Sequence, residues 1–136
     1  MNSNGKAPVV IFSIELGAGC QRTGFDVLQD LGIPYKEIEG GVGCFEGVKE
    51  QCYAIPQSRF TDEVKAFLQG NGQRCVLHLD NQYNAWLATA ENDYGNWLTE
   101  GVMPQYLGTF RQLPESQAVK AQGWSRFGGK YYVAGR

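Results

Sequence analysis

The sequence predicts an α+β domain of the ferredoxin-like class, in which an antiparallel sheet carries two helices and additional C-terminal strands follow. The first observation is the order strand, helix, strand, strand, helix, strand over residues 8–79, which is the split βαβ arrangement of such sandwiches. The second is size, because 136 residues suit one domain. The third is composition, since 43% hydrophobic and 19% charged residues are typical of a globular chain. We expect a flexible N-terminus over residues 1–7 and one domain over residues 8–136.

The first predicted helix lies between two predicted strands. Residues 8–14 are a β-branched apolar run, which predicts a strand, and a tight turn at residues 17–19 follows it. Apolar side chains then recur at helical spacing, at Phe25, Leu28 and Leu31. Residues 35–39 alternate between apolar and polar, which predicts a half-exposed strand.

A glycine-rich segment precedes the next predicted strand. Residues 40–47 contain four glycines, so we expect a loop whose backbone can approach a ligand closely. A flexible hairpin loop with two solvated carboxylates, Glu46 and Glu50, explains the same composition equally well. Residues 48–55 then alternate as a strand that Pro56 ends.

The remaining elements are a second helix and several strands. Thr61 is a good N-cap for a helix with an apolar stripe, and residues 75–79 and 85–90 predict a hairpin around a polar turn. Strands are also expected at residues 106–113 and 130–133, with a polar connection between them. An open sheet of this kind leaves unpaired edges, and a small symmetric oligomer is one way to cover them.

Charge and hydropathy exclude several classes of protein. The net charge is −2, which argues against a general nucleic-acid binder. No apolar run approaches the length of about 20 residues that spans a bilayer, and residues 1–8 lack an apolar signal core. We therefore expect a soluble cytoplasmic protein that acts on a small molecule.

The residues that most often bind metals or perform acid–base chemistry are few. The four cysteines form no CxxC pair and His78 is the only histidine, so we expect no metal and read the cysteines as reduced, buried apolar residues. His78 lies mid-strand, where a packed or surface role is expected. The turn at residues 17–19 has neither the P-loop ending nor a dinucleotide fingerprint, so it predicts only a tight turn.

Several short segments resemble one family, the phage-encoded S-adenosylmethionine-degrading enzymes, which were first called hydrolases and are now understood as lyases. Residues 73–77, with Gln82 in the following turn, are similar to that family's Asp-Cys-Val-Leu strand and its turn glutamine. Residues 107–114 resemble its Gly-Ser-Phe-x-x-Val-Pro segment, and residues 127–133 resemble its closing strand. The opening strand with Ser13, the Gly43-Cys44-aromatic step and the acid at Glu50 are similar as well.

The resemblance implies a catalytic domain with a PII-like fold, assembled as a homotrimer that holds substrate between its subunits. It implies cofactor-free cleavage of S-adenosylmethionine to 5′-methylthioadenosine and homoserine lactone, a reaction that would deplete the methyl donor of restriction–modification systems. The family's essential acid would fall at Glu50, with Glu46 as the alternative. Its tyrosine would fall at Phe45, a departure that removes the hydroxyl, and Tyr35 and Tyr53 are the candidates to replace it.

The chemistry implied by the resemblance needs little acid–base machinery, because the substrate's own carboxylate can displace neutral methylthioadenosine. Glu50 would orient the substrate, and Phe45 and Ser13 would line the site. Two other functions remain open. One is a sensor that binds an adenine nucleotide without turning it over, and the other is a phage protein that inhibits a host enzyme through its aromatic surface.

Overall fold

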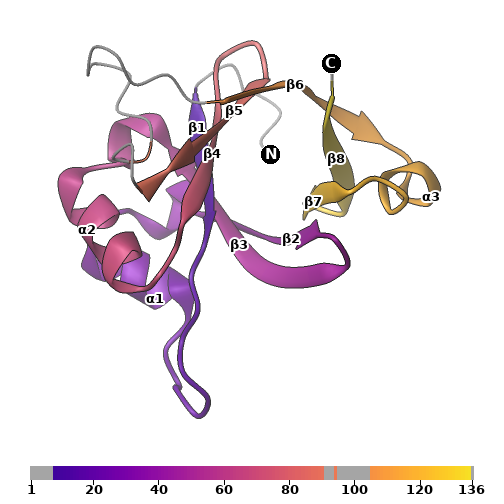
Figure 1. The fold of residues 1–136 in the computed structure, drawn as a ribbon. Coiled ribbons are helices and arrows are strands. Elements are labelled where there is room, and N and C mark those ends of the chain that lie inside the picture. Colours follow the sequence, from indigo (N-terminus) through magenta and orange to yellow (C-terminus); the bar gives the residue numbers. More distant parts are fainter. Residues whose placement is uncertain (1–7, 91–93, 95–104, 136) are drawn as a thin grey trace.

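Eight antiparallel strands close into a barrel in the computed structural model, which describes residues 8–90, 94 and 105–135 (Figure 1). Around the ring the strands follow the order β1-β3-β2-β7-β8-β6-β5-β4. Their bounds are β1 Val9–Ser13, β2 Glu39–Phe45, β3 Val48–Pro56, β4 Cys75–Leu79, β5 Asn84–Thr89, β6 Gln105–Leu113, β7 Gly123–Phe127 and β8 Lys130–Gly135.

The helices of the described residues are short. They are α1 Gly24–Asp30, α2 Asp62–Gly70 and α3 Glu115–Ala118, with 3-10 turns at Tyr35–Glu37 and Gln57–Arg59. A capping box formed by Thr23 and Asp26 begins α1, and the Thr61 hydroxyl accepts a hydrogen bond from the Val64 amide at the start of α2. Within the described ranges, no helix has the length and apolar character needed to cross a membrane.

The prediction of a ferredoxin-like, PII-like sandwich is wrong. The order of elements up to β4 is as expected, and β1 to β4 lie side by side in the order β4-β1-β3-β2. The sheet does not end there, because β2 also pairs with β7 and β4 also pairs with β5. The C-terminal strands therefore complete a ring instead of extending an open sheet, and the ring leaves none of its strands with an unpaired edge.

Three local predictions are also wrong, and two of them concern the strands that close the ring. The glycine-rich residues expected to be a loop form β2, while the expected strand at residues 35–39 is mostly a 3-10 turn. The expected polar connection before residue 130 contains α3 and β7. The stretch 91–96, expected to be a loop, lies outside the described residues except for Tyr94.

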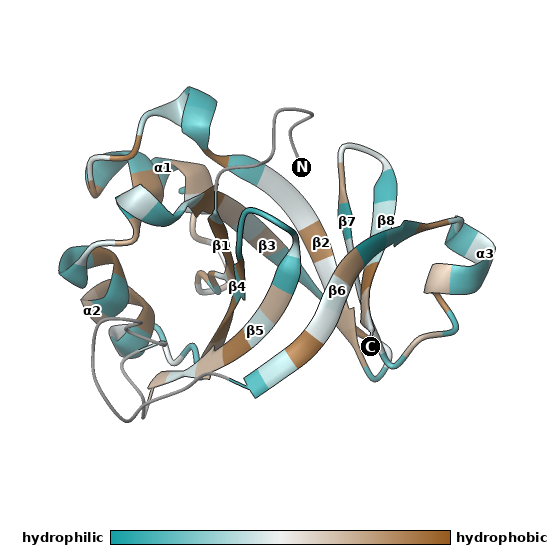
Figure 2. Ribbon diagram, turned by 90° about the horizontal axis from the view of Figure 1, so that it is seen from above, coloured by the Kyte–Doolittle hydropathy of each residue, from teal (hydrophilic) through white to brown (hydrophobic). Residues whose placement is uncertain are grey.

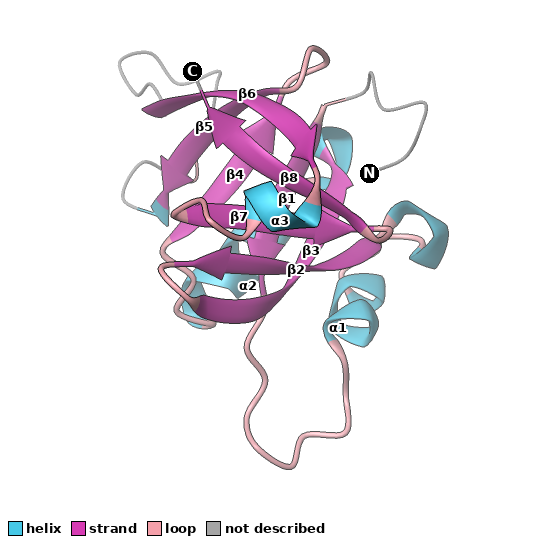
Figure 3. Cartoon of the chain, turned by 90° about the vertical axis from the view of Figure 1, so that its right-hand side faces the viewer, coloured by secondary structure: helices cyan, strands magenta, loops and turns pink. Residues whose placement is uncertain are grey.

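The core has two layers, one outside the barrel wall and one inside it. Strand residues alternate between the layers, so that Val10 and Phe12 face the helices while Ile11 faces the interior. Figure 2 shows α1 and α2 together on one side of the barrel, and α3 lies on the opposite side next to β8 (Figure 3). The outer layer is made of Val10, Phe12, Ile14, Leu28, Ile33, Ile38, Tyr53, Ile55, Val64, Leu68, Val76, Ala88 and Tyr94. The inner layer is made of Ile11, Cys52, Ala54, Leu79, Ala85, Phe110 and Phe127.

The strand pair β2–β7 approaches so closely that Gly41 has no room for a side chain. Gly41 pairs with Phe127, and a Cβ at Gly41 would lie 2.3 Å from the carbonyl oxygen of Arg126 and 2.6 Å from the Phe127 ring. A backbone oxygen cannot move aside as the end of a flexible side chain can. Glycine at this position is therefore a condition of the strand pairing that closes the barrel.

His78 is the buried polar residue of the outer layer. Its Nε2 lies 2.6 Å from the carbonyl oxygen of Tyr94, so the neutral ring donates a hydrogen bond that holds Tyr94 against the barrel. The His78 ring also packs edge-on against Phe60 at 5.7 Å between centroids. Burial lowers the pKa of His78 below its ordinary 6.5, the Tyr94 hydrogen bond opposes this shift, and nearby Lys65 adds to it. Of the packed and surface roles expected for His78, the structure shows the packed one.

Replacing Gly41 with alanine is predicted to destabilise the protein by about 1–3 kcal/mol, the usual effect of overpacking. The new methyl group would overlap the Arg126 carbonyl, so β2 and β7 would have to separate. Gly17→Ala is the matched control, because nothing lies within 4 Å of a Cβ there. Urea denaturation of both variants measures the difference, and equal midpoints would contradict a steric limit at β2–β7.

The free energy of unfolding is predicted to decrease as the pH falls through the ordinary histidine pKa of 6.5. The unfolded chain takes up a proton there while buried His78 resists it, so stability rises with pH by up to about 1.4 kcal/mol per pH unit in that window. His78→Gln keeps a hydrogen-bond donor but does not titrate. Urea denaturation between pH 5.5 and 7.5 should show a weaker pH dependence in this variant, and an unchanged dependence would exclude His78 as the cause.

Candidate functional site

A serine and a glutamate meet at one end of the barrel. The Ser13 hydroxyl donates a hydrogen bond to Oε2 of Glu50 at 3.0 Å, although the two residues are 37 positions apart in sequence. Ser13 is the last residue of β1 and pairs with Cys52 of β3, two residues beyond Glu50. Both side chains share the inward phase of the buried Ile11 and Ala54, while Glu50 itself is exposed. The pair therefore lies at a solvent-exposed end of the barrel, which we call the mouth.

Small and polar residues surround this pair on the neighbouring strands. Gly43 of β2 pairs with both Glu50 and Ser125, so it leaves space between them on the same face of the wall. Cys52 lies buried across from Ser13, and Cys75 begins β4 on the other side of β1. The mouth thus combines one carboxylate with hydroxyl and thiol groups.

The two thiols at the mouth are poor acids. Burial, with a smaller contribution from the Glu50 carboxylate, raises the pKa of Cys52 to about 12. The same two causes, again with desolvation first, raise the pKa of Cys75. At neutral pH both cysteines therefore remain protonated and uncharged, and Glu50 is the group at the mouth that can meet a cation. The expectation that the cysteines are buried fails for Cys20 and Cys75, which are exposed.

Phe45 and Glu46 lie at the tip of the β2–β3 hairpin. Phe45 pairs with Val48 and shares the inward phase of Gly43 and Glu50, but its side chain is 60% exposed. Glu46 occupies the turn with a φ of 51° and accepts a hydrogen bond from Nε2 of Gln122 at 3.0 Å. Phe45 thus lies further out on the face that carries Glu50, whereas the Glu46 carboxylate is engaged at the turn.

The predicted tyrosines lie on the outer side of the barrel wall. Tyr53 pairs with Phe12, faces the helices, and packs edge-on against Phe25 at 5.3 Å between centroids. Burial raises the pKa of Tyr53, and a hydrogen bond at the Gly24 backbone opposes this. Tyr35 lies beside the same Phe25 ring at 5.4 Å and is 64% exposed. The barrel wall therefore separates the Tyr53 hydroxyl from Glu50.

Gln82 belongs to the opposite end of the barrel. Strand β4 runs from Cys75 near Ser13 to Leu79, which pairs with Val9, and the turn containing Gln82 follows Leu79. The backbone amide of Gln82 donates to Oδ1 of Asp80 at 2.8 Å. Of the residues proposed from the sequence, the fold joins Ser13 to Glu50, places the exposed Phe45 further out on the same face, and separates Gln82 from them.

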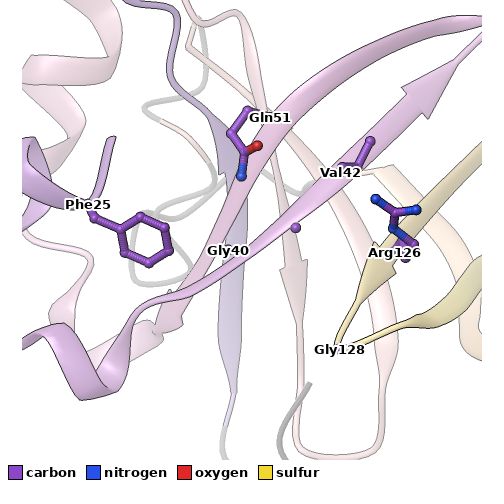
Figure 4. Close-up of a pocket in the computed structure, with 7 residues that line it drawn as sticks. Phe25, Gly40, Val42, Gln51, Arg126 and Gly128 are labelled. Carbon is purple, nitrogen blue, oxygen red and sulfur yellow. The ribbon is translucent and has the colours of Figure 1, made fainter. Parts of the chain in front are cut away.

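A second candidate site opens on the outer side of the same strands. It is a shallow pocket of about 370 Å³ between α1, β2, β3 and β7 (Figure 4). Its lining residues are Phe25, Gly40, Gly41, Val42, Gln51, Arg126 and Gly128. Sequence reasoning pointed to the glycines but not to Arg126 or Phe25, because the pairing of β2 with β7 brings them together and no local motif announces that pairing.

Comparison with known proteins does not assign a family. The chain matches no family model and no curated protein. The described residues include no group of three or more histidine, cysteine, aspartate or glutamate side chains placed to hold a metal ion. The resemblance to S-adenosylmethionine-degrading enzymes therefore rests on its own short segments.

Glu50→Gln is predicted to raise the reactivity of Cys75 toward a thiol reagent severalfold near pH 8. Removing the carboxylate removes a negative charge that opposes thiolate formation, so the pKa of Cys75 should fall. Exposed Cys20 provides the internal reference in the same sample. Peptide mass spectrometry after brief alkylation gives the ratio of the two cysteines, and a ratio equal to that of the unmodified protein would contradict an interaction between Glu50 and Cys75.

Proposed function

We propose that the protein degrades S-adenosylmethionine by intramolecular lactone formation, releasing 5′-methylthioadenosine and homoserine lactone. Such a reaction makes it a carbon–sulfur lyase that needs no cofactor. The observation that carries the proposal is the hydrogen bond from Ser13 to Glu50 at the mouth of the barrel. The likeness to S-adenosylmethionine-degrading enzymes points to Ser13 and to Glu50 separately, and the hydrogen bond shows that both residues lie at one place in the fold.

The proposed reaction is a displacement within one substrate molecule. A carboxylate oxygen of the substrate bonds to its own γ-carbon, the bond from that carbon to sulfur breaks, and the electron pair remains on sulfur. The carboxylate and sulfonium charges cancel along this path, so the reaction proceeds faster where water is excluded and the substrate is held in a folded conformation. The buried, uncharged thiol of Cys52 suits such surroundings.

Glu50 is proposed to bind the substrate's ammonium group. A carboxylate placed against the sulfonium would stabilise the reactant more than the transition state, because the sulfonium charge disappears as the bond breaks, and the reaction would slow. The ammonium charge stays constant, so an ion pair there positions the substrate without this penalty. Ser13 would orient the Glu50 carboxylate through its hydrogen bond.

The biological setting follows from the same likeness. The enzyme would work in the bacterial cytoplasm as a phage counter-defence that depletes the methyl donor of restriction–modification systems. The likeness also suggests a homotrimer with substrate between subunits. A closed ring has no unpaired strand edges for other subunits to cover. The support for a trimer is instead the exposure of the apolar residues Phe45 and Val48, which are 60% and 63% accessible beside the mouth.

Purified protein incubated with S-adenosylmethionine is predicted to produce 5′-methylthioadenosine, with homoserine lactone appearing before homoserine. Glu50→Gln should reduce kcat/KM by about 100-fold or more, the scale of a misplaced substrate, and Ser13→Ala by about tenfold. Glu46→Gln is the matched control, because its carboxylate is bonded to Gln122 at the hairpin turn. Chromatography of the products measures all four proteins.

Two outcomes would redirect the assignment. Loss of activity in Glu46→Gln with full activity in Glu50→Gln would move the essential acid to the hairpin turn. Intact substrate after long incubation at high protein concentration would exclude the lyase. If that intact substrate were nevertheless bound, the sensor function would take its place.

A further inference from the structure

We propose that the outer pocket is a second binding site, which takes a planar ring carrying a carboxylate or phosphate group. This site lies on the opposite face of β2 and β3 from Glu50 and does not depend on the proposed lyase reaction. Adjacent residues illustrate the separation, because Glu50 shares the inward phase of Ala54 while Gln51 lines the outer pocket.

The floor and polar side of the pocket come from three neighbouring strands. Val42 of β2 pairs with Gln51 of β3 on one side and with Arg126 of β7 on the other, so an amide, an isopropyl group and a guanidinium lie in a row. Figure 4 shows the Gln51 and Arg126 side chains on either side of Val42. A guanidinium with a neighbouring amide donor suits the oxygens of a carboxylate or phosphate.

Arg126 is available for an anion. No carboxylate in the described part of the chain forms an ion pair with it, and none of the pocket's lining residues is acidic. Its guanidinium lies 5.9 Å from the centre of the Tyr131 ring, a contact made through the ring face and not through a hydrogen bond. Two other arginines, Arg22 and Arg59, are by contrast paired with Asp30 and Glu37.

The apolar side of the pocket is a fixed aromatic ring. Phe25 lies over Gly40, where a Cβ would come within 2.6 Å of the ring, so glycine is what lets the ring reach the sheet. Tyr35 and Tyr53 hold Phe25 at 5.4 and 5.3 Å between centroids. A ring edge fixed in this way offers a second planar group a tilted or offset contact. With about 370 Å³, the pocket is in the size range of small-ligand sites.

The first test uses adenosine 5′-monophosphate and adenosine as probes, followed by NMR. The monophosphate should bind with a dissociation constant of roughly 0.1–1 mM and adenosine about tenfold more weakly, because the guanidinium contributes only to the anion. The Val42 methyl groups and the Gln51 side-chain amide should shift. Phenylacetate against phenylacetamide repeats the comparison for a carboxylate, so the two arms determine which anion the site prefers.

Variants locate the site and separate it from the lyase mouth. In Arg126→Gln the advantage of each anion over its neutral analogue should vanish, while Arg111→Gln, at an exposed arginine of β6 outside the pocket, should keep it. Glu50→Gln should also keep it, so binding here can succeed even if the lyase reaction fails.

The proposal is overturned by any of three results. The first is that neither anion binds better than its neutral analogue. The second is that Arg126→Gln binds both anions as the unmodified protein does. The third is that inorganic phosphate binds as tightly as the monophosphate. The last result would mean that Phe25 contributes nothing and that no ring is recognised.

Discussion

The close approach of β2 to β7 is the constraint on which the rest of the structure depends. Seven of the eight neighbouring strand pairs could exist in an open sheet, and the pairing of β2 with β7, which begins where Gly41 meets Phe127, closes that sheet into a ring. A side chain at Gly41 would collide with the backbone of β7. Glycine there lowers the intrinsic strand propensity of β2, and the closed ring compensates by pairing β2 on both sides.

Closure also explains why one pair of strands carries two candidate sites. Successive residues of a strand point to opposite faces of the barrel wall, so Glu50 and Gln51 lie in different environments although they are adjacent in sequence. The glycines of β2 act on both faces. Gly43 leaves room beside Glu50 inside the mouth, and Gly40 lets Phe25 settle on the outside. A single glycine-rich strand therefore shapes both surfaces.

Local patterns predicted most elements but not the topology. The apolar run of β1, the Thr61 cap of α2 and the β4–β5 hairpin depend on neighbours in sequence, and each is where the patterns indicated. The two missed strands, β2 and β7, are stabilised by one another across some 80 residues. A high content of glycine and polar residues is typical of loops, so the local sequence does not distinguish these strands from loops. Without this one pair of strands, the remaining elements match an open sandwich, which is why the sequence predicted a sandwich and not a closed barrel.

Sequence patterns pointed to Ser13 and Glu50 separately, but they predicted neither the bond between these residues nor the thiols beside them. Register decides the grouping, because Ser13 meets Glu50 only when β1 pairs with β3 with Ser13 opposite Cys52. The same register also determines which hydroxyl group lies next to the Glu50 carboxylate. Tyr53 pairs with Phe12 on the outer face and Tyr35 packs on Phe25 outside the wall, so neither hydroxyl shares the mouth. The hydroxyl bonded to Glu50 is that of Ser13. The Glu50 carboxylate therefore has a hydroxyl partner even though position 45 is phenylalanine and not tyrosine.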